Sequence, residues 1–262
     1  MSTVRQPAVA GLFYPDDPDL LRQQISQFLQ VAAKDNPAPK AVIAPHAGYI
    51  YSGPVAGSAY AAVSKLRNQV NRVVLLGPAH RVHVRGFATV SAGAFRTPLG
   101  DSPVDVETIQ ALTADFPFVQ VMDNAHAQEH SLEVHIPFLQ ETINEFALVP
   151  LLVGDASPQQ VDAILQRLWG GPETLIVISS DLSHYHPYVT AVEIDLRTTE
   201  AIQALAPEAI THEQACGRIP VCGLLREARS RGMTVTTIDL RNSGDTAGPR
   251  DRVVGYGSYL FS

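Results

Sequence analysis

The chain has 262 residues, a length that α/β folds commonly cover as one unit. Hydrophobic residues make up 45% and charged residues 17%, which is typical of a folded globular protein and excludes a disordered one. The formal net charge of −7 arises from 26 acidic and 19 basic residues, and no basic run is present that could follow a phosphate backbone. We therefore expect no nucleic-acid partner.

Membrane and disulfide signals are also absent from the sequence. No segment has the eighteen or so uninterrupted apolar residues that a membrane span needs, and residues 1–15 do not have the pattern of a signal peptide. We therefore expect a cytoplasmic protein with no membrane partner. Cys216 and Cys222 are too few for a disulfide framework and are spaced wrongly for a CxxC motif, so we interpret both as core or surface thiols.

Apolar runs and amphipathic stretches alternate along the chain. Runs of Val, Ile and Leu without polar alternation predict strands covered on both faces, and helical spacing predicts the helices between them. In chain order we expect a helix at 18–33, a strand at 41–45, a helix at 53–66, a strand at 73–78, a helix at 104–114, a strand at 147–154, a helix at 157–169, a strand at 174–180, helices at 193–205 and 221–232, and strands at 234–240 and 252–261. This order predicts one α/β domain over residues 1–262, with a mostly parallel or mixed central sheet and helices on both faces.

Three of the predicted strands lead into a histidine. His46 follows the strand at 41–45, His80 follows the strand at 73–78, and His184 follows the strand at 174–180. In an open parallel sheet, ligands bind outside the carboxyl ends of the strands, where connecting loops converge. Imidazole at such a place can bind a metal, transfer a proton or hold a loop carbonyl. The threefold recurrence favours a functional pocket, and loop stabilisation is the alternative.

The segment EHSLEVHIPFLQ, residues 129–140, carries a further candidate group and is expected to form a helical turn. His130 and Glu133 are three residues apart, so they would share one face and line the pocket, whereas His135 would point elsewhere, toward the core. The pattern HxxExH is neither HExxH nor HxxEH, so a zincin-type peptidase is disfavoured. The alternative is a purely structural helix start, with Ser131 as its cap.

The remaining polar candidates are less specific. Asp181 lies three residues before His184 and either orients that imidazole or a ligand, or caps a helix, and the two interpretations stay open. We interpret the other histidines as surface or loop residues: His83, His126, His186 and His212. No GxGxxG, P-loop or GxSxG pattern is present, which excludes the common nucleotide-binding and serine-hydrolase signatures.

Several blocks of the sequence, taken together, resemble the Memo family. They are AGLFYP from Ala10, APHAGYIYSG from Ala44, LGPAH from Leu76, FRTPLG from Phe95, EHSLEVHIPF from Glu129, SSDLSH from Ser179, CGRIP from Cys216 and the closing VVGYGSYLF. The resemblance spans nearly the whole chain. It implies a fold similar to class III extradiol dioxygenases, the non-haem iron enzymes that open catechol rings, with a central mixed sheet in one α/β domain.

The resemblance also implies roles for individual residues. His46 and His80 would match two metal-ligand histidines of the ring-opening enzymes, and His184 would match their acid–base histidine. The third ligand is a carboxylate in those enzymes and a cysteine of a late loop in the animal Memo protein; here that position falls on Thr246, with Asp245 beside it, in the loop NSGDTAG. Two histidines with Asp245 would suit Fe(II), whereas threonine alone would bind iron poorly.

Aromatic residues are expected to wall the same pocket. Phe13 and Tyr14 belong to the AGLFYP block, and Tyr49 follows His46 closely in the sequence. Their rings would supply apolar surface for a ligand, and core packing is the alternative for Phe13.

Three functions remain open from the sequence. The first is a metal-dependent redox enzyme in which Fe(II), or another ion such as Cu or Zn, is bound at His46 and His80 and His184 transfers protons. The second is a binding module for a peptide or small molecule, as the animal family member's association with phosphotyrosine-containing receptor peptides implies. The third is a partner of AMMECR-type and radical-SAM proteins, as the bacterial members of the family imply.

Overall fold

The computed structural model describes residues 3–31 and 36–262. Within these residues a nine-stranded mixed sheet has the order β10-β12-β2-β9-β3-β8-β4-β7, with β11 paired to β12. Its strands are β2 (Ala41–Ala44), β3 (Arg72–Pro78), β4 (Phe87–Thr89), β7 (Val119–Val121), β8 (Ala147–Val153), β9 (Thr174–Ser179), β10 (His184–His186), β11 (Val235–Asn242) and β12 (Val253–Phe261). A smaller sheet joins β1 (Val4–Arg5), β5 (Ala94–Thr97) and β6 (Gly100–Pro103).

The four central strands are parallel and buried on both faces. β2 pairs with β9, β9 with β3 and β3 with β8, all in parallel register. Their side chains alternate between two apolar cores, so that Val42 enters one core and Ile43 the other. Because both faces are dry, the strands consist of Val, Ile, Leu and Ala without polar alternation.

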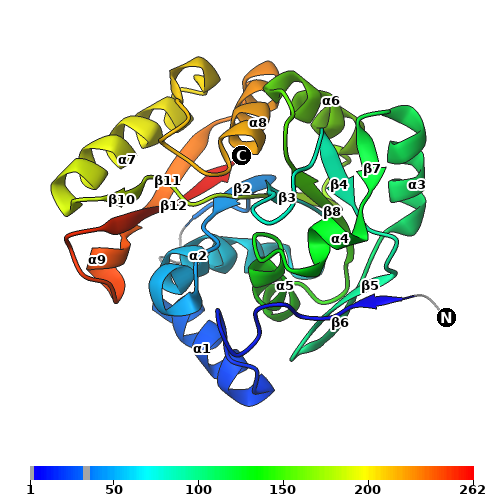
Figure 1. The fold of residues 1–262 in the computed structure, drawn as a ribbon, viewed down its shortest axis with the longest axis horizontal. Helices are drawn as coiled ribbons and strands as arrows, with labels where there is room; N and C mark the ends of the chain where they lie inside the picture. The colour runs from blue at the N-terminus through cyan, green and yellow to red at the C-terminus, as the bar shows by residue number, and fades with distance from the viewer. Residues whose placement is uncertain (1–2, 32–35) are drawn as a thin grey trace.

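Helices cover both faces of this sheet (Figure 1). On one face lie α1 (Pro18–Val31), α2 (Tyr49–Val63) and α5 (Ile136–Thr142), and on the other lie α6 (Pro158–Leu168) and α8 (Arg218–Ser230). The helix α7 (Tyr188–Gln203) packs on β11 and β12, and α3 (Val106–Asp115) packs at the β7 edge. Short helical turns complete the described chain: η1 (Ser64–Leu66), α4 (Asp123–Ala127), η2 (Glu133–His135), η3 (Pro207–Ala209) and α9 (Ser243–Thr246).

Local sequence features set the start and the packing of these helices. Ser157 caps α6: its hydroxyl accepts the backbone N–H of Gln160, whose side chain accepts the N–H of Ser157 in return. On α2, a side chain at Gly53 or Gly57 would overlap Phe28, so the two glycines allow α1 and α2 to approach closely. This close contact holds α2 against α1.

The sequence-based prediction of an α/β fold with helices on both faces of a mixed sheet is confirmed. The short strands at 87–103, 119–121 and 184–186 were missed, because three or four residues carry too little pattern. The helix expected at 129–140 starts later, since residues 133–135 form a 3₁₀ turn and α5 begins at Ile136. Ala32 and Ala33, expected at the end of the first helix, lie outside the described residues.

No helix among residues 3–31 and 36–262 is both long enough and apolar enough to cross a membrane.

The double-sided burial of the central strands predicts a large cost for truncating one of them. Replacing Ile176, which is fully buried on β9, by Ala should lower the free energy of unfolding by about 2 to 5 kcal/mol, because buried methyl and methylene groups are lost and a cavity remains. Leu20, exposed on α1, should change it by less than about 0.5 kcal/mol under the same substitution. Urea unfolding of both variants measures the difference, and equal effects would contradict the buried position of β9.

Candidate metal centre

The carboxyl ends of β2, β9 and β3 meet at one edge of the sheet. Ala44 pairs with Ser179, so His46 and Asp181 leave neighbouring strands side by side, and His80 follows β3 next to them. A cavity of about 830 Å³ opens at this edge. Its wall includes the side chains on which the chemistry depends: His46, His80, His130, Asp181, His184 and Cys216.

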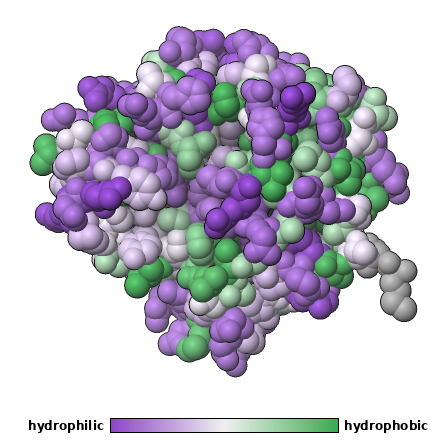
Figure 2. Space-filling model, in the orientation of Figure 1, coloured by the Kyte–Doolittle hydropathy of each residue, from purple (hydrophilic) through white to green (hydrophobic). Residues whose placement is uncertain are grey.

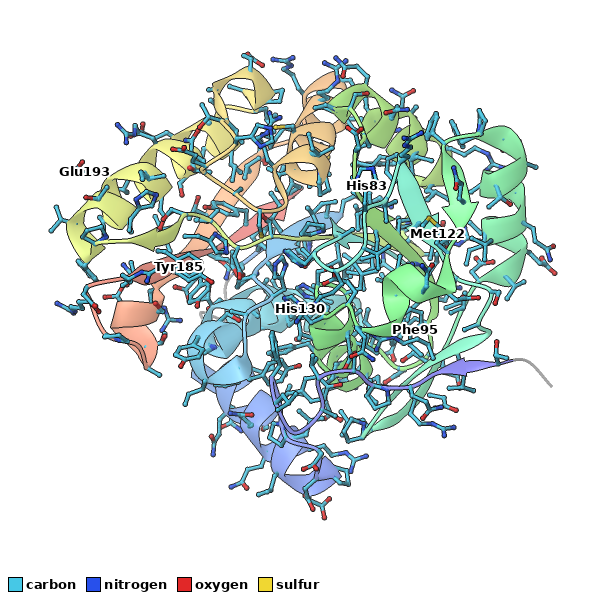
Figure 3. All side chains as sticks on the ribbon, viewed as in Figure 1. His83, Phe95, Met122, His130, Tyr185 and Glu193 are labelled. Carbon is cyan, nitrogen blue, oxygen red and sulfur yellow. The ribbon has the colours of Figure 1, made fainter. Side chains whose placement is uncertain are left out.

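Three histidines converge in the wall of this cavity: His46 is buried, His130 is partly buried and His80 is exposed. His46, His80 and His130 each offer one ring nitrogen, and the three nitrogens lie within 4.8 Å of one another. The rings of His80 and His130 are stacked, with centroids 4.8 Å apart, and the ring of His46 lies edge-on to both at 5.2 and 5.5 Å. Figure 3 shows His130 near the centre of this face of the molecule. Three imidazole nitrogens at this separation can bind one transition-metal ion.

A hydrogen-bond relay fixes the tautomer of His46. Its Nδ1 lies 2.6 Å from the Ser179 hydroxyl, which in turn donates to the carbonyl of Ser131 at 2.6 Å. Because the hydroxyl has a single proton, it accepts from His46 Nδ1–H. The lone pair is therefore on Nε2, the nitrogen that lies 3.3 Å from the Cys216 sulfur.

One carboxylate positions the other two histidines. Glu129 accepts the backbone N–H of His80 at 2.5 Å and His80 Nδ1–H at 3.0 Å, which leaves His80 Nε2 as the electron-pair donor. The same carboxylate accepts the backbone N–H groups of His130 and Ser131 at 2.9 and 3.0 Å. His130 Nδ1 lies 3.2 Å from it without the alignment of a hydrogen bond. Glu129 thus joins the end of β3 to the turn that carries His130.

The electrostatics keep two of these imidazoles neutral. Burial, followed by the charges of neighbouring histidines, lowers the pKa of His46 well below its usual value. Burial also lowers the pKa of His130 to about 4, against the opposing charge of Glu129. For Glu129, burial alone would raise the pKa, but its hydrogen bonds from His80 and Ser131 outweigh burial and lower it to about 2. A histidine must be neutral to bind a metal, so neutral imidazoles beside the ionised carboxylate of Glu129 are the protonation states that a metal site requires.

Cys216 is a functional candidate that sequence reasoning missed. Its thiol lies 3.3 Å from His46 Nε2, and its backbone N–H donates to the carbonyl of Asp181 just before α8. Burial, then the nearby charge of Asp181, raises the pKa of this thiol well above its usual value, so the thiol stays protonated and its S–H can donate a hydrogen bond to His46 Nε2. The available signal was the block CGRIP, but its approach to His46, 170 residues earlier, cannot be read from spacing.

The expectation that Asp245 or Thr246 supplies the third ligand requires a correction, because both lie in α9, between β11 and β12, and neither lines the cavity. The carboxylate of Asp245 accepts the backbone N–H of Asn242 at 3.1 Å and the Tyr188 hydroxyl at 2.7 Å. The Thr246 hydroxyl donates to its own helix, at the carbonyl of Ser243. Hydrogen bonds within and around α9 engage both side chains, and the third nitrogen that lies near those of His46 and His80 belongs to His130.

Asp181 and His184 line the cavity near the three histidines. Asp181 accepts the backbone N–H of His46 at 2.7 Å, and burial raises the pKa of its carboxyl to about 6 against the lowering effect of nearby His184. The Nδ1 of His184 lies 2.9 Å from the carbonyl of Leu182, so it donates there and leaves Nε2 as the acceptor. Tyr185, next along β10 and left of His130 in Figure 3, has a φ of 62°, a strained conformation for a residue with a side chain.

The expected pocket residues fall into two groups. Phe13 lines the cavity, with its ring 4.7 Å from that of His130. Tyr14, Tyr49 and Glu133 lie behind the wall instead: the carboxylate of Glu133 pairs with Arg5 and accepts the Tyr14 hydroxyl at 2.6 Å, and the Tyr49 hydroxyl bonds a backbone carbonyl.

The shared helical face expected for His130 and Glu133 is not formed, since His130 precedes the 3₁₀ turn that contains Glu133. As expected, His135 is in the core, where its Nδ1 contacts the Tyr60 hydroxyl at 2.9 Å. The expectation that His126 is a surface or loop residue is wrong, because it is buried in α4, where it donates through Nε2 to the carbonyl of Ala88. His83 and His212 are exposed, as expected, and both His212 and His186 line the cavity.

Comparison with known proteins follows from this geometry. The family model described as Memo-like protein matches residues 5–260. The chain belongs to the Memo family. A MEMO1 family protein of Sulfolobus acidocaldarius is 33% identical over 98% of this chain and 99% of its own length, and one of Aquifex aeolicus is 35% identical over the same shares. The Memo resemblance seen in the sequence blocks is thereby confirmed.

A solved structure supports the fold of this Memo-family chain. An uncharacterized protein of Escherichia coli K12 superposes with a TM-score of 0.53, covering 84% of this chain and 98% of that one. Its sequence identity is 12%, so the likeness concerns the fold alone.

The contacts of Glu129 predict a loss of metal affinity when its charge is removed. Glu129→Gln should weaken Co²⁺ binding by about 10- to 100-fold and alter the Co²⁺ absorption spectrum, because the neutral amide has only one acceptor oxygen for the four N–H groups of His80, His130 and Ser131. Glu193, exposed on α7, provides the matched control Glu193→Gln, which should bind as the wild type does. Competition with a chromogenic chelator measures both affinities. Unchanged binding and spectrum in Glu129→Gln would contradict the positioning role.

The buried histidines away from the cavity wall predict acid sensitivity of the metal-free protein. Burial lowers the pKa of His126 to about 4 and that of His135 to about 3, whereas in the unfolded chain both titrate near 6.5. The unfolded state therefore binds more protons below pH 6.5, and stability that is present above that pH is lost as the pH falls toward 4.

Replacing His135 by Gln should reduce the slope of unfolding free energy against pH by about 1.4 kcal/mol per pH unit between pH 6 and 4. Urea unfolding at several pH values gives the slope, with His83→Gln, at an exposed histidine, as the control. An unaltered slope in His135→Gln would show that this imidazole is protonated in the folded protein.

Proposed function

We propose that this Memo-family protein is a metal-dependent oxidoreductase that binds a small substrate over a mononuclear site of His46, His80 and His130. The observation that carries the proposal is the convergence of three ring nitrogens within 4.8 Å in the wall of a cavity. Cys216, 3.3 Å from His46 Nε2, is proposed as a fourth donor.

The chemistry of the donors fits a transition metal. Imidazole suits Fe, Cu and Zn, and a thiol adds preference for Cu and Zn. His46 and His80 each have Nδ1 engaged, by Ser179 and Glu129, which directs Nε2 to a metal in the way that ligand histidines commonly show. We propose a redox-active ion: Fe(II), as the likeness to extradiol dioxygenases implies, or copper, as the thiol favours.

Residues of the chain would transfer the proton, position the ligand histidine and orient the substrate. A bound metal would supply Lewis-acid or electron-transfer chemistry. His184 would take a proton from the substrate at Nε2, because its Nδ1–H is held by the carbonyl of Leu182. Asp181 would hold the backbone of His46 in place, and Phe13 would provide the apolar wall against which a substrate is oriented.

The alternative of a non-catalytic binding module is less consistent with the hydrogen bonds. Histidines retained without metal would satisfy one another, yet across the described residues no hydrogen bond joins two rings of this trio. The Nδ1 groups of His46 and His80 are instead bonded outward, to Ser179 and Glu129, and one nitrogen of each of the three rings converges inward. This arrangement favours a metal over a peptide in the same place.

Metal analysis of variants tests the proposal. His46→Ala and His130→Ala should each lose most of the metal that the anaerobically purified wild type retains after loading with Fe(II) or Cu, because each removes one of three donors. His184→Ala should retain the metal and lose metal-dependent oxygen uptake, since its imidazole transfers protons and does not hold the ion. His83→Ala, at an exposed histidine, is the control.

Two results would count against this assignment. Equal metal content in wild type and His46→Ala would contradict the proposed metal site. Loss of metal in His184→Ala would indicate that His184 is a metal ligand. Circular dichroism of each variant separates both results from misfolding.

A further inference from the structure

Large apolar side chains lie exposed beside the mouth of the cavity. Leu12 is 81% exposed and directly precedes Phe13 of the cavity wall. Ile50 is 63% exposed and follows Gly48 of the same wall by two positions. Figure 2 shows an apolar area on this face, over the N-terminal segment and the start of α2. Isolated exposed leucines are common on proteins, so the meaning of this pair depends on whether the two segments meet.

The two segments are joined directly. The backbone N–H of Tyr49 donates to the carbonyl of Phe13 at 2.7 Å, which brings the turn at Leu12 against the first turn of α2. A side chain placed at Gly48 would contact Phe13 on one side and the ring of Tyr51 on the other. The exposed apolar residues therefore form one surface continuous with the cavity wall, which we call the apolar shelf: Leu12, Phe13, Ile50 and Tyr51.

The shelf is presented by a rigid turn. The N–H groups of Leu12 and Phe13 both donate to the carbonyl of Val9, at 3.1 and 2.8 Å, and Gly11 adopts a φ of 76° that the turn requires. Glu133 fixes the same segment from behind, since it accepts the N–H of Val9 at 3.0 Å. The exposure of Leu12 is thus imposed by a well-bonded backbone, and its side chain stays in water beside the cavity.

The charges of the cavity limit what can lie against the shelf. Across residues 3–31 and 36–262 the wall carries no Lys or Arg, whereas it includes Asp181 and Glu213. The protein as a whole has a formal charge of −7. Beyond the proposed metal site, a charged anionic arm of a ligand would therefore have no cationic side chain of the wall to pair with, whereas an uncharged apolar arm needs none.

The size of the shelf decides between a protein and a small molecule as its occupant. A stable protein interface buries roughly 800 Å² on each partner, from about 20 to 30 residues. Four side chains next to a cavity fall well short of that number of residues, so a short hydrocarbon chain or a substituted ring that extends out of the cavity is the better occupant.

We propose that the substrate is a molecule with two parts: a small polar head that binds the metal at His46, His80 and His130, and an uncharged apolar arm that crosses Phe13 onto Leu12 and Ile50. This inference rests on the proposed metal site and names the class of its substrate. It assigns the shelf as the part of the protein that selects for the arm.

A series of alkyl hydroxamates tests this assignment, because the hydroxamate head binds metal and only the arm changes. The probes are acetohydroxamate, butanohydroxamate, hexanohydroxamate and octanohydroxamate, titrated calorimetrically into protein loaded with Zn²⁺, which adds no redox chemistry. Each added methylene that reaches the shelf should tighten binding by up to about fourfold. The affinity should therefore rise steadily along the series.

Variants locate the effect. Leu12→Ser and Ile50→Ser should each weaken octanohydroxamate by at least about fivefold, while acetohydroxamate, which is too short to reach them, changes less than about twofold. Leu196→Ser, at a leucine 48% exposed on α7 and outside the cavity wall, is the matched control and should bind both probes as the wild type does.

The outcomes separate the two proposals. Binding of acetohydroxamate without any gain along the series would overturn the apolar arm and leave the metal site intact. A gain that survives in Leu12→Ser and Ile50→Ser would overturn the shelf as its location. Failure of Zn²⁺ and of every hydroxamate to bind would overturn the metal site and this inference together.

Discussion

The carboxylate of Glu129 is the contact on which the arrangement of the site depends. It is buried between the end of β3 and the turn at residues 129–131, where an unpaired charge would be costly. Four N–H groups, from His80, His130 and Ser131, offset that cost. Because one group satisfies donors of two segments, the ring of His80 and the backbone of His130 cannot move apart without leaving the buried charge short of donors. The stacking of His80 on His130 follows from this shared anchor.

The topology of the sheet supplies the rest of the geometry. The neighbouring order β2-β9-β3 places three carboxyl ends side by side, so His46, Asp181 and His80 enter one cavity without any long loop. The two cores on either face hold these strands rigidly, as close packing of Val, Ile and Leu requires. Polar side chains at the strand ends are therefore held in place by apolar residues that never contact a ligand. Stability and site geometry share one origin in this family member.

The sequence predicted the part of the site that depends on strand ends and missed the part that depends on distant contacts. His46 and His80 could be located because a buried strand directly precedes each of them. His130 was found as a pocket residue, although its expected partnership with a helical neighbour was wrong, since the helix begins only after it. Asp245 was chosen for its chemistry, but the hydrogen bonds of α9 occupy it. Cys216 was missed because a contact across 170 residues leaves no periodic signal.

The clamp between Arg5 and Glu133 has a consequence for how the protein matures. Arg5 reaches across 128 positions to that carboxylate, and Cys216 reaches back 170 positions to His46. While the chain is being synthesised on the ribosome, the cavity wall is therefore incomplete and the Cys216 thiol is missing until the segment up to α8 has emerged. Pairings of this range form late, because their loop-closure entropy must be overcome first. The contact between the Cys216 thiol and His46 can therefore form only after residue 216 has been synthesised.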